Sequence, residues 1–347
     1  MVTRFAALSL SPLIAICAAL FAAAPAQAQL KTVNVGIANT SSDIGFFIAD
    51  KKGYFKEQGI AVKITPFASA ALMVAPLGAG QLDVGGGTVA AGLYNAVSSK
   101  INVKIVADKG SIREGYEYST LMIRKDLVDS GKFKSFKDLK GMTIATAAQG
   151  AGSESQLNEA LKKGGLKYTD VKVVYLGFPQ QLAAMANKGI DAGVTVEPTV
   201  TRAEKEGVAV RASKTVIYPG QQNAVVLYAE GFIAQRPLAE KFMVAYLRAV
   251  RDYNDSLKNG KIAGPNAKEI IDILTEYTAV KDPKIYAEIT PGACDPDGKV
   301  NVATLKNDFN FFKQRGYIPD VKIGVEDVID NSFAAAAVKQ LGPYKKK

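Results

Sequence analysis

One order of strands and helices is written twice along this chain, and this repeat limits the fold more than any other feature. In each copy an alternating apolar and polar segment leads into a small polar loop, a helical segment and a second alternating segment. Strands separated by helices favour parallel sheets built from βαβ units, so we predict two similar α/β lobes. The alternative is an α/β protein whose elements are merely evenly spaced. Equivalent positions keep a nearly constant separation along the chain: Val35 and Ile144, Val62 and Val171, Ile64 and Val173, Asp83 and Asp191.

Two further strand-like segments, residues 118–123 and 223–228, bracket the second copy. They indicate that the chain crosses between the lobes twice, which makes a hinge. We therefore assign residues 29–119 and 225–347 to lobe 1 and residues 120–224 to lobe 2.

Helical spacing of apolar residues predicts helices over residues 43–56 and 70–79 in the first copy. From Pro237 onward an apolar stripe at the same spacing predicts a helical C-terminal third. This third has no repeat of its own, and we expect it to pack on lobe 1.

The segment at positions 1–28 has the pattern of a secretory signal. Arg4 gives a positive start, residues 13–24 form an uninterrupted apolar run, and residues 25–28 (Pro-Ala-Gln-Ala) offer small side chains before a cut. We place the cut between Ala28 and Gln29 and expect an exported protein. A retained membrane anchor is the alternative, but a span needs about 20 apolar residues.

Composition excludes several classes of function. The chain has no histidine, so it cannot form a Ser-His-Asp or Cys-His nucleophile, a histidine-ligated zinc site or an imidazole base. Its net charge of +10 comes from dispersed lysines, and the one dense cluster, residues 345–347, has no interleaved aromatics, so we expect no nucleic-acid partner. Without the leader, Cys294 is the single cysteine and no intramolecular disulfide can form. We expect no metal, no cofactor, no catalytic residue and no stable membrane insertion.

Small, polar, backbone-exposing loops follow strands in both copies, where ligands bind in open α/β sheets. The four loops are residues 39–42, residues 85–88, residues 149–153 and the stretch around Glu197. For each loop alone, ordinary capping and turn chemistry is the alternative. Micromolar affinity needs about −8 kcal/mol, and an anion at one helix end gains only about 0.3–2 kcal/mol, so several loops must converge on one ligand. The candidate ligand-binding residues are Asn39, Thr40, Ser41, Gly86, Gly87, Thr88, Gln149, Gly150, Gly152, Ser153, Glu197 and, near the hinge, Tyr116.

The chain resembles the solute-binding proteins of bacterial ABC importers, in the nitrate, sulfonate and taurine group that includes binders of thiamine pyrimidine precursors. The resemblance covers about residues 33–200. It implies the type II periplasmic binding protein fold, with two doubly wound α/β lobes joined by two hinge strands. The segments that carry the resemblance are Gly53-Tyr54-Phe55 with residues 59–62, residues 77–83, residues 136–144, and residues 189–192 with Glu197-Pro198.

The resemblance also implies a function: capture of a small organic anion or zwitterion in the periplasm by lobe closure, and its delivery to an inner-membrane permease with its ATPase. It implies a monomer and no enzymatic activity. The matching cleft positions are residues 39–41, 86–88 and 150–153 and Glu197. Sulfonate binders often have Trp-Asp-Pro where this chain has Val196-Glu197-Pro198, so the aromatic wall is missing and the acid is longer.

Glu197 leads to a hypothesis about the ligand. A carboxylate in a dry cleft needs a donor, so we expect an anionic ligand end near Ser153 and Thr88 and an amine or N–H end on Glu197. A zwitterionic sulfonate and an aminopyrimidine both fit. The alternative is that Glu197 caps the helix after Pro198 or pairs with Arg202.

Two other functions stay open. One is an enzyme on the same architecture, although the pyrimidine-synthesising relatives are thought to use a histidine that this chain lacks. The other is a receptor that serves a tripartite secondary transporter.

Overall fold

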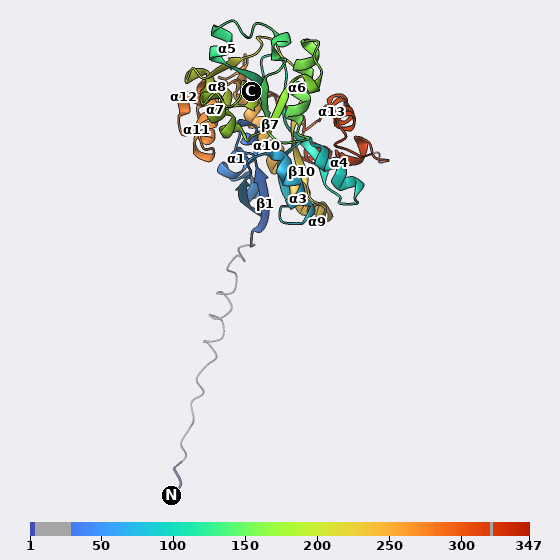
Figure 1. The fold of residues 1–347 in the computed structure, drawn as a ribbon. Helices are drawn as coiled ribbons and strands as arrows, with labels where there is room; N and C mark the ends of the chain where they lie inside the picture. Colours follow the sequence, from blue (N-terminus) through green and yellow to red (C-terminus); the bar gives the residue numbers. More distant parts are fainter. Residues whose placement is uncertain (4–28, 320–321) are drawn as a thin grey trace.

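The computed structural model of the chain describes residues 1–3, 29–319 and 322–347 and contains two separate five-stranded sheets (Figure 1). The first sheet lies in the lower half of Figure 1 and the second in the upper half. Of the predicted secretory signal, residues 1–28, the part from residue 4 to residue 28 lies outside the described residues. Within the described ranges, no helix has the length and apolar character needed to cross a bilayer.

The first sheet is mixed, with strand order β2-β1-β3-β10-β4. β1 is parallel to β2 and β3, whereas β10 runs antiparallel to both of its neighbours. The strands are β1 (Lys31–Ile37), β2 (Ile60–Pro66), β3 (Val84–Thr88), β4 (Lys104–Ser111) and β10 (Gln222–Tyr228).

The second sheet repeats this arrangement with strand order β7-β6-β8-β5-β9. β6 is parallel to β7 and β8, and β5 runs antiparallel to both of its neighbours. The strands are β5 (Ser119–Arg124), β6 (Thr143–Thr146), β7 (Lys172–Tyr175), β8 (Ala192–Val196) and β9 (Ala209–Arg211).

The two sheets agree in register as well as in order. Val35 pairs with Ile64 on one side and with Val84 on the other. Ile144, its predicted equivalent, pairs with Val173 and Ala192. The partners in the second sheet therefore follow those in the first at nearly the same offset along the chain. The prediction of two related α/β lobes is confirmed.

A carboxylate fastens the first strand of each copy of the repeat. Asp83 Oδ2 accepts from the backbone N–H of Asn34 at 2.7 Å, and Asp191 Oδ2 accepts from the backbone N–H of Thr143 at 2.9 Å. Asp83 precedes β3 and bonds to β1, and Asp191 precedes β8 and bonds to β6. The aspartate that recurs in the sequence thus makes the same hydrogen bond to a strand backbone in both lobes.

The chain passes between the sheets twice, through residues 112–118 and residues 212–221. The two crossing segments bond to each other: the N–H of Ile112 donates to the carbonyl of Gln221 at 3.0 Å, and the N–H of Gly220 donates to the carbonyl of Ile112 at 2.8 Å. The expected lobe limits lie within β5 and β10, the strands that follow the crossings. A paired double connection limits the lobes to bending about one narrow region.

Helices cover both sheets, and the longest predicted helices are interrupted. Gly53, with a φ of 74°, ends the helix expected over residues 43–56, and residues 70–73 form a 3-10 turn before α3. In lobe 1 the helices are α1 (Ile44–Lys51), α2 (Tyr54–Glu57), α3 (Val74–Gly78) and α4 (Ala91–Ser98). In lobe 2 they are α5 (Lys125–Asp129), α6 (Gly152–Lys163), α7 (Phe178–Ala186) and α8 (Thr199–Lys205).

The C-terminal third is helical and packs mainly on lobe 1. Phe242 and Tyr246 of α10 lie in the same buried core as Val33 of β1 and Phe46 of α1. Two of its helices also reach lobe 2, because α12 contacts α8 and α13 contacts α6. The elements are α9 (Glu230–Ala234), α10 (Arg236–Ser256), β11 (Leu257–Lys258), β12 (Lys261–Ile262), α11 (Ala267–Tyr277), α12 (Pro283–Glu288), α13 (Val302–Gln314) and α14 (Ser332–Leu341).

The prediction of a loop at residues 85–88 is wrong. This glycine-rich stretch is the buried strand β3, which lies between β1 and β10. Glycine weakens a strand and usually indicates a turn, so its density hid the strand. Close packing explains the glycines: a Cβ on Gly86 would lie 2.9 Å from both Asp43 Oδ1 and the Phe46 ring.

Candidate functional site between the lobes

Loops at the carboxyl ends of the parallel strands of the two sheets contact each other directly. Ser41, after β1, donates its N–H to the carbonyl of Glu197, after β8, at 3.2 Å. Ala91, after β3, donates its N–H to the carbonyl of Gly150, after β6, at 2.8 Å. Because ligands of open α/β sheets bind at this edge, the space between these contacts is the candidate site.

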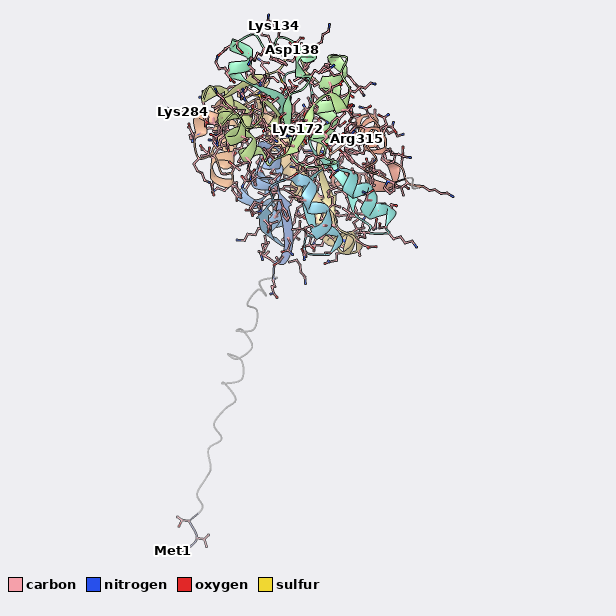
Figure 2. The ribbon with its side chains drawn as sticks, viewed as in Figure 1. Met1, Lys134, Asp138, Lys172, Lys284 and Arg315 are labelled. Carbon is pink, nitrogen blue, oxygen red and sulfur yellow. The ribbon has the colours of Figure 1, made fainter. Side chains whose placement is uncertain are left out.

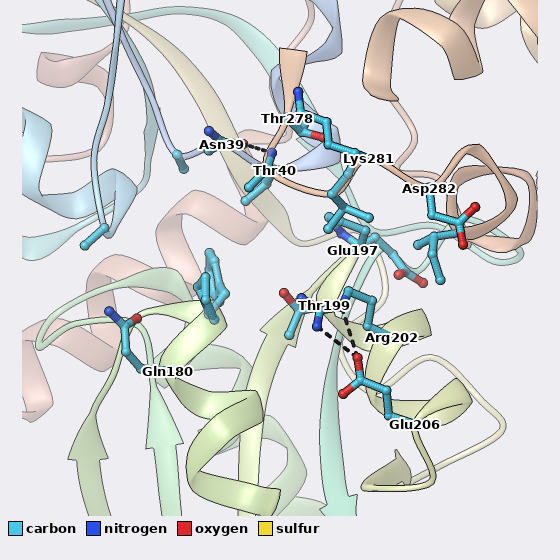
Figure 3. A pocket seen from close by; sticks show the side chains of 18 of the residues that line it. Asn39, Thr40, Gln180, Glu197, Thr199, Arg202, Glu206, Thr278, Lys281 and Asp282 are labelled. Carbon is cyan, nitrogen blue, oxygen red and sulfur yellow. Dashed lines mark hydrogen bonds and ion pairs between the residues drawn. The ribbon is translucent and has the colours of Figure 1, made fainter. Parts of the chain in front are cut away.

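An outer cleft of about 790 Å³ opens between the lobes, and Figure 3 shows it from close by. Asn39, Thr40 and Thr278 approach it from one side, and Gln180 and Arg202 from the other. Phe67 and Phe178, which follow the edge strands β2 and β7, add aromatic surface. The volume is within the range of small-molecule sites, about 300–1,000 Å³.

A deep pocket of about 40 Å³ lies next to the cleft and shares Ala38, Thr40 and Phe178 with it. One water molecule occupies about 30 Å³ of liquid, so the deep pocket has room for a few atoms in this state of the protein. Both lobes line it. Its polar lining residues are Thr40, Ser42, Ser69, Thr88, Lys109, Tyr118, Ser119, Ser153 and Asn223.

Lys109 of β4 brings a buried ammonium to the deep pocket. The residue is 3% exposed, and its Nζ donates to Asp43 Oδ1 at 2.7 Å and to Ser42 Oγ at 2.9 Å. Asp43 Oδ2 also accepts from the backbone N–H of Thr40, at 2.9 Å. Sequence reasoning missed Lys109, because its partners lie on a distant segment of the chain and no local motif surrounds it.

Hydroxyl groups of the deep pocket already have partners and keep spare capacity. Thr88 Oγ1 donates to the carbonyl of Asn223 at 2.6 Å, and Ser153 Oγ accepts from the backbone N–H of Ala147 at 3.2 Å. A hydroxyl has one donor and two acceptor positions, so each can add a bond to a ligand.

The carboxylate of Glu197 is buried among donors of the protein itself. Its Oε1 accepts from Arg211 Nη2 at 3.0 Å and from the N–H of Thr290 at 3.1 Å, and Oε2 accepts from the N–H of Thr201 at 3.0 Å. Burial raises the pKa of Glu197, and Arg211 and these hydrogen bonds act against the rise. Glu197 therefore caps α8, as the alternative interpretation expected, but its cation is Arg211, whereas Arg202 pairs with Glu206 at 2.9 Å.

Half of the twelve candidate residues line the two cavities. Gly86 packs against the lobe 1 core, Gln149 is exposed, and Tyr116 packs against the lobe 1 core from the first crossing segment. Asn39, Thr40 and Glu197 line the outer cleft, and Thr40, Gly87, Thr88 and Ser153 line the deep pocket. Ser41, Gly86, Gln149, Gly150, Gly152 and Tyr116 line neither cavity.

A second contact between the lobes joins α13 to α6, and no sequence motif predicted it. Ser155 Oγ of α6 and Tyr218 OH of the second crossing segment both donate to Asp308 Oδ1 of α13. Burial raises the pKa of Asp308 to about 7, while these hydrogen bonds act against the rise. Arg315, labelled in Figure 2 beyond the end of α13, stacks over the ring of Tyr168 at 4.3 Å.

The site offers binding groups and no evident metal centre. Among residues 29–319 and 322–347, no group of three or more Asp, Glu or Cys side chains is placed to hold a metal ion. The chemistry available in the deep pocket is hydrogen bonding from hydroxyls and one ammonium, and the outer cleft next to it has both aromatic and charged side chains.

Several known proteins are similar to this chain in sequence. The family model described as NMT1/THI5 like matches residues 40–256. A binding protein of Brucella abortus is 25% identical over 71% of this chain and 70% of its own length. A Bacillus subtilis protein named for binding aliphatic sulfonates is 26% identical over 90% of each chain, and the taurine-binding periplasmic protein of Escherichia coli is 25% identical over 88% of this chain and 94% of its own.

Solved structures share the fold at low sequence identity. The alkanesulfonate-binding protein of Xanthomonas axonopodis, bound to MOPS, aligns with a TM-score of 0.67 at 16% identity, over 87% of this chain and 99% of its own. The periplasmic nitrate-binding protein of Synechocystis aligns with a TM-score of 0.70 at 13% identity, over 90% and 89%. The type II periplasmic binding protein fold predicted from the sequence is thereby confirmed.

Proposed function

The chain belongs to the NMT1/THI5 like family, and on this premise we propose that it is the substrate-binding component of an ABC importer. It captures a small organic anion or zwitterion in the periplasm and delivers it to an inner-membrane permease and its ATPase. The names of the Bacillus and Escherichia relatives, which cover nearly the whole chain, support this function. The secretory pattern of residues 1–28 supports the location.

The observation that carries the proposal is the pair of adjoining cavities between two lobes that share a double connection. Residues of both lobes line the deep pocket, so a ligand there contacts both at once. A ligand with more contacts in the closed state shifts the population toward closure. Closure about the crossing segments is then the signal that a permease can recognise.

A match to an enzyme provides the second candidate. The 4-amino-5-hydroxymethyl-2-methylpyrimidine phosphate synthase of Saccharomyces cerevisiae is 27% identical over 46% of this chain and 43% of its own length. It favours an aminopyrimidine as the alternative ligand. We propose binding without catalysis, because the chain has no imidazole base and the one amine beside a hydroxyl in the described lining of the deep pocket, Lys109 next to Ser42, is held in an ion pair with Asp43.

The test is identification of the natural ligand. Protein is purified from the periplasm of the native host, the bound molecule is released and identified by mass spectrometry, and it is then added back to ligand-free protein. We expect a rise in Tm and a decrease in the radius of gyration by small-angle X-ray scattering. A chemically altered product, or a ligand that binds without changing the radius of gyration, would contradict the proposal.

A further inference from the structure

Lys109 is the one charged side chain that lines the deep pocket, as far as the described parts of the chain extend. Its counter-ion, Asp43, does not line the pocket and packs behind the lysine, close to Gly86 of β3. A ligand in the pocket therefore meets the ammonium and not the carboxylate.

The ammonium can bond to a ligand without losing its present partners. A lysine carries three N–H donors, and the described residues supply two acceptors, Asp43 Oδ1 and Ser42 Oγ. Keeping Asp43 paired matters, because an isolated buried charge is costly. The third donor remains for an acceptor inside the pocket.

Other groups at the pocket favour the same kind of atom. Ala151 and Ser153 line it at the first turn of α6, a helix of 12 residues whose N-cap makes no side-chain hydrogen bond. The positive end of a helix dipole attracts an anion. Glu154, an acid in the same turn, does not line the pocket, because its carboxylate accepts from the N–H of Gly150 and from the hydroxyls of Tyr168 and Tyr317. Helix end and ammonium together can therefore balance an anionic ligand oxygen that the charge of Asp43 would otherwise repel.

The outer cleft, next to the deep pocket, has more apolar surface than the pocket. The outer cleft presents Phe67, Phe178, Pro179, Val280 and Ile285 next to the shared residues of the two cavities. Charged side chains of both signs also line this cleft: Arg202, Lys205, Glu206, Lys281 and Asp282. A molecule with a polar head of a few atoms in the pocket would extend its remaining atoms along this apolar surface. Burial there adds about 25 cal/mol for each Å² of apolar surface.

We propose that Lys109 is the specificity-determining residue of the site, and that it selects an organic acid whose terminal anionic group enters the deep pocket and whose apolar tail lies along the outer cleft. This inference rests on the proposed function and names its ligand class. Glu197 takes no part in recognition of this acid, because Arg211, Thr201 and Thr290 occupy its carboxylate. Carboxylates and sulfonates share the required oxygen acceptors.

The experiment uses the mature chain and three probes with the same tail: hexanoate, 1-hexanesulfonate and the neutral hexanamide. Isothermal titration gives each Kd. We expect one or both acids to bind at least tenfold more tightly than hexanamide, since a hydrogen bond to a charged group contributes about 1.5–3 kcal/mol. The Kd values of the two acids show whether the pocket fits a planar carboxylate or a tetrahedral sulfonate better.

Variants separate recognition from structural pairing. In the double variant Lys109→Met with Asp43→Asn both charges are removed, so no buried charge is left unpaired. We expect it to fold, as judged by circular dichroism, and to lose the preference for acids by at least tenfold. Lys241→Met is the matched control, because Lys241 is exposed on α10 and lines neither cavity, and it should leave the preference unchanged within about twofold.

Three results would overturn the inference: hexanamide binding as tightly as the acids, a double variant that keeps the preference, or no binding of either acid at millimolar concentration. If the acids fail but the molecule recovered from the native periplasm closes the lobes, this inference falls and the proposed function stands. If nothing closes the lobes, the proposed function falls as well.

Discussion

The two lobes share strand order, register and an aspartate that fastens the first strand of each copy of the repeat, yet they use a buried ion pair differently. In lobe 1, Lys109 and Asp43 are both internal to the lobe, and the lysine lines the deep pocket. In lobe 2, Glu197 pairs with Arg211 and also accepts from Thr290, which follows α12 in the C-terminal third. The repeated scaffold thus presents a cation to the ligand on one side and a lobe-to-lobe contact on the other.

This difference shows that the repeated strand order determines at which edge of the sheets the site forms. It does not determine which side chains lie there. Asp83 and Asp191 hold equivalent strands with equivalent bonds. Lys109 has no counterpart in the other lobe, within the described residues, that lines the deep pocket. Variants that remove one of these interactions at a time measure what each contributes to stability or to the arrangement of the lobes.

The largest loss of stability is expected when the ion pair between Glu197 and Arg211 in lobe 2 is broken. Arg211→Met leaves the buried Glu197 carboxylate without its cation, which costs about 3–5 kcal/mol of the free energy of unfolding. Urea denaturation of the mature chain measures it. Because Arg211 Nη2 also donates to Thr290 Oγ1 at 3.4 Å, the variant loses a contact between lobe 2 and the C-terminal third, and the ligand-free radius of gyration should also increase.

The matched control is the double variant Glu197→Gln with Arg211→Met, which leaves no unpaired charge and should recover most of the lost stability. The lobe 1 double variant at Lys109 and Asp43 should leave the ligand-free radius of gyration unchanged, since that pair joins no lobes. If Arg211→Met and the lobe 1 double variant change the ligand-free radius of gyration by the same amount, the contrast between the two ion pairs is wrong.

The shared aspartates should give similar, intermediate effects, since each carboxylate holds a strand N–H and one further partner: Asn34 Nδ2 at 3.1 Å for Asp83 and Arg124 Nη1 at 3.5 Å for Asp191. Asp83→Ala and Asp191→Ala each leave a strand N–H without its acceptor, at a cost of about 1–3 kcal/mol. Unfolding of the two single variants in urea, with the same m-value, compares them directly. A loss confined to one of them would show that the repeat in sequence is not a repeat in energetics.

The smallest expected effect is a pH dependence from the contact between α13 and α6. Asp308 has a raised pKa of about 7, so the folded state holds a proton that the unfolded chain releases from about pH 4 upward. Its contribution to stability is therefore lost as pH rises from about 4 to 7. Asp308→Asn should flatten this part of the Tm profile.

A residual slope should remain in that variant, because burial also raises the pKa of Glu117 to about 7 and that of Asp108 to about 6. A profile of Tm between pH 4 and 7.5 that is the same with and without Asp308 would mean that this acid is ionised throughout. The contact between α13 and α6 would then not change over this pH range.

The sequence supported the architecture because periodicity and turn residues are local signals. Val35 and Ile144 sit in alternating segments whose spacing repeats, and their sheet partners follow that spacing. The strand at Gly86 was missed because glycine lacks the side chain that gives a strand its pattern.

The site was predicted less well for a different reason. Thr40, Thr88 and Ser153 lie in or beside loops with recognisable capping chemistry, and they do line the cavities. Lys109 lies inside an unremarkable strand and meets Asp43 only after folding. For Glu197, the true partner Arg211 lies 14 positions away on β9, beyond the helical spacing that pointed to Arg202.

The most direct test of lobe closure is the distance between the edge strands as a ligand binds. Lys63 of β2 and Lys172 of β7 are exposed, occupy equivalent positions of the repeat, and lie on strands that lead into the mouth of the cleft. Both are replaced by cysteine and spin-labelled in the mature Cys294→Ala chain, and the distance is measured by double electron–electron resonance. We expect a longer, broader distribution without ligand and a shorter, narrow one with it. One unchanged distribution under both conditions would contradict the claim that the lobes close on a guest.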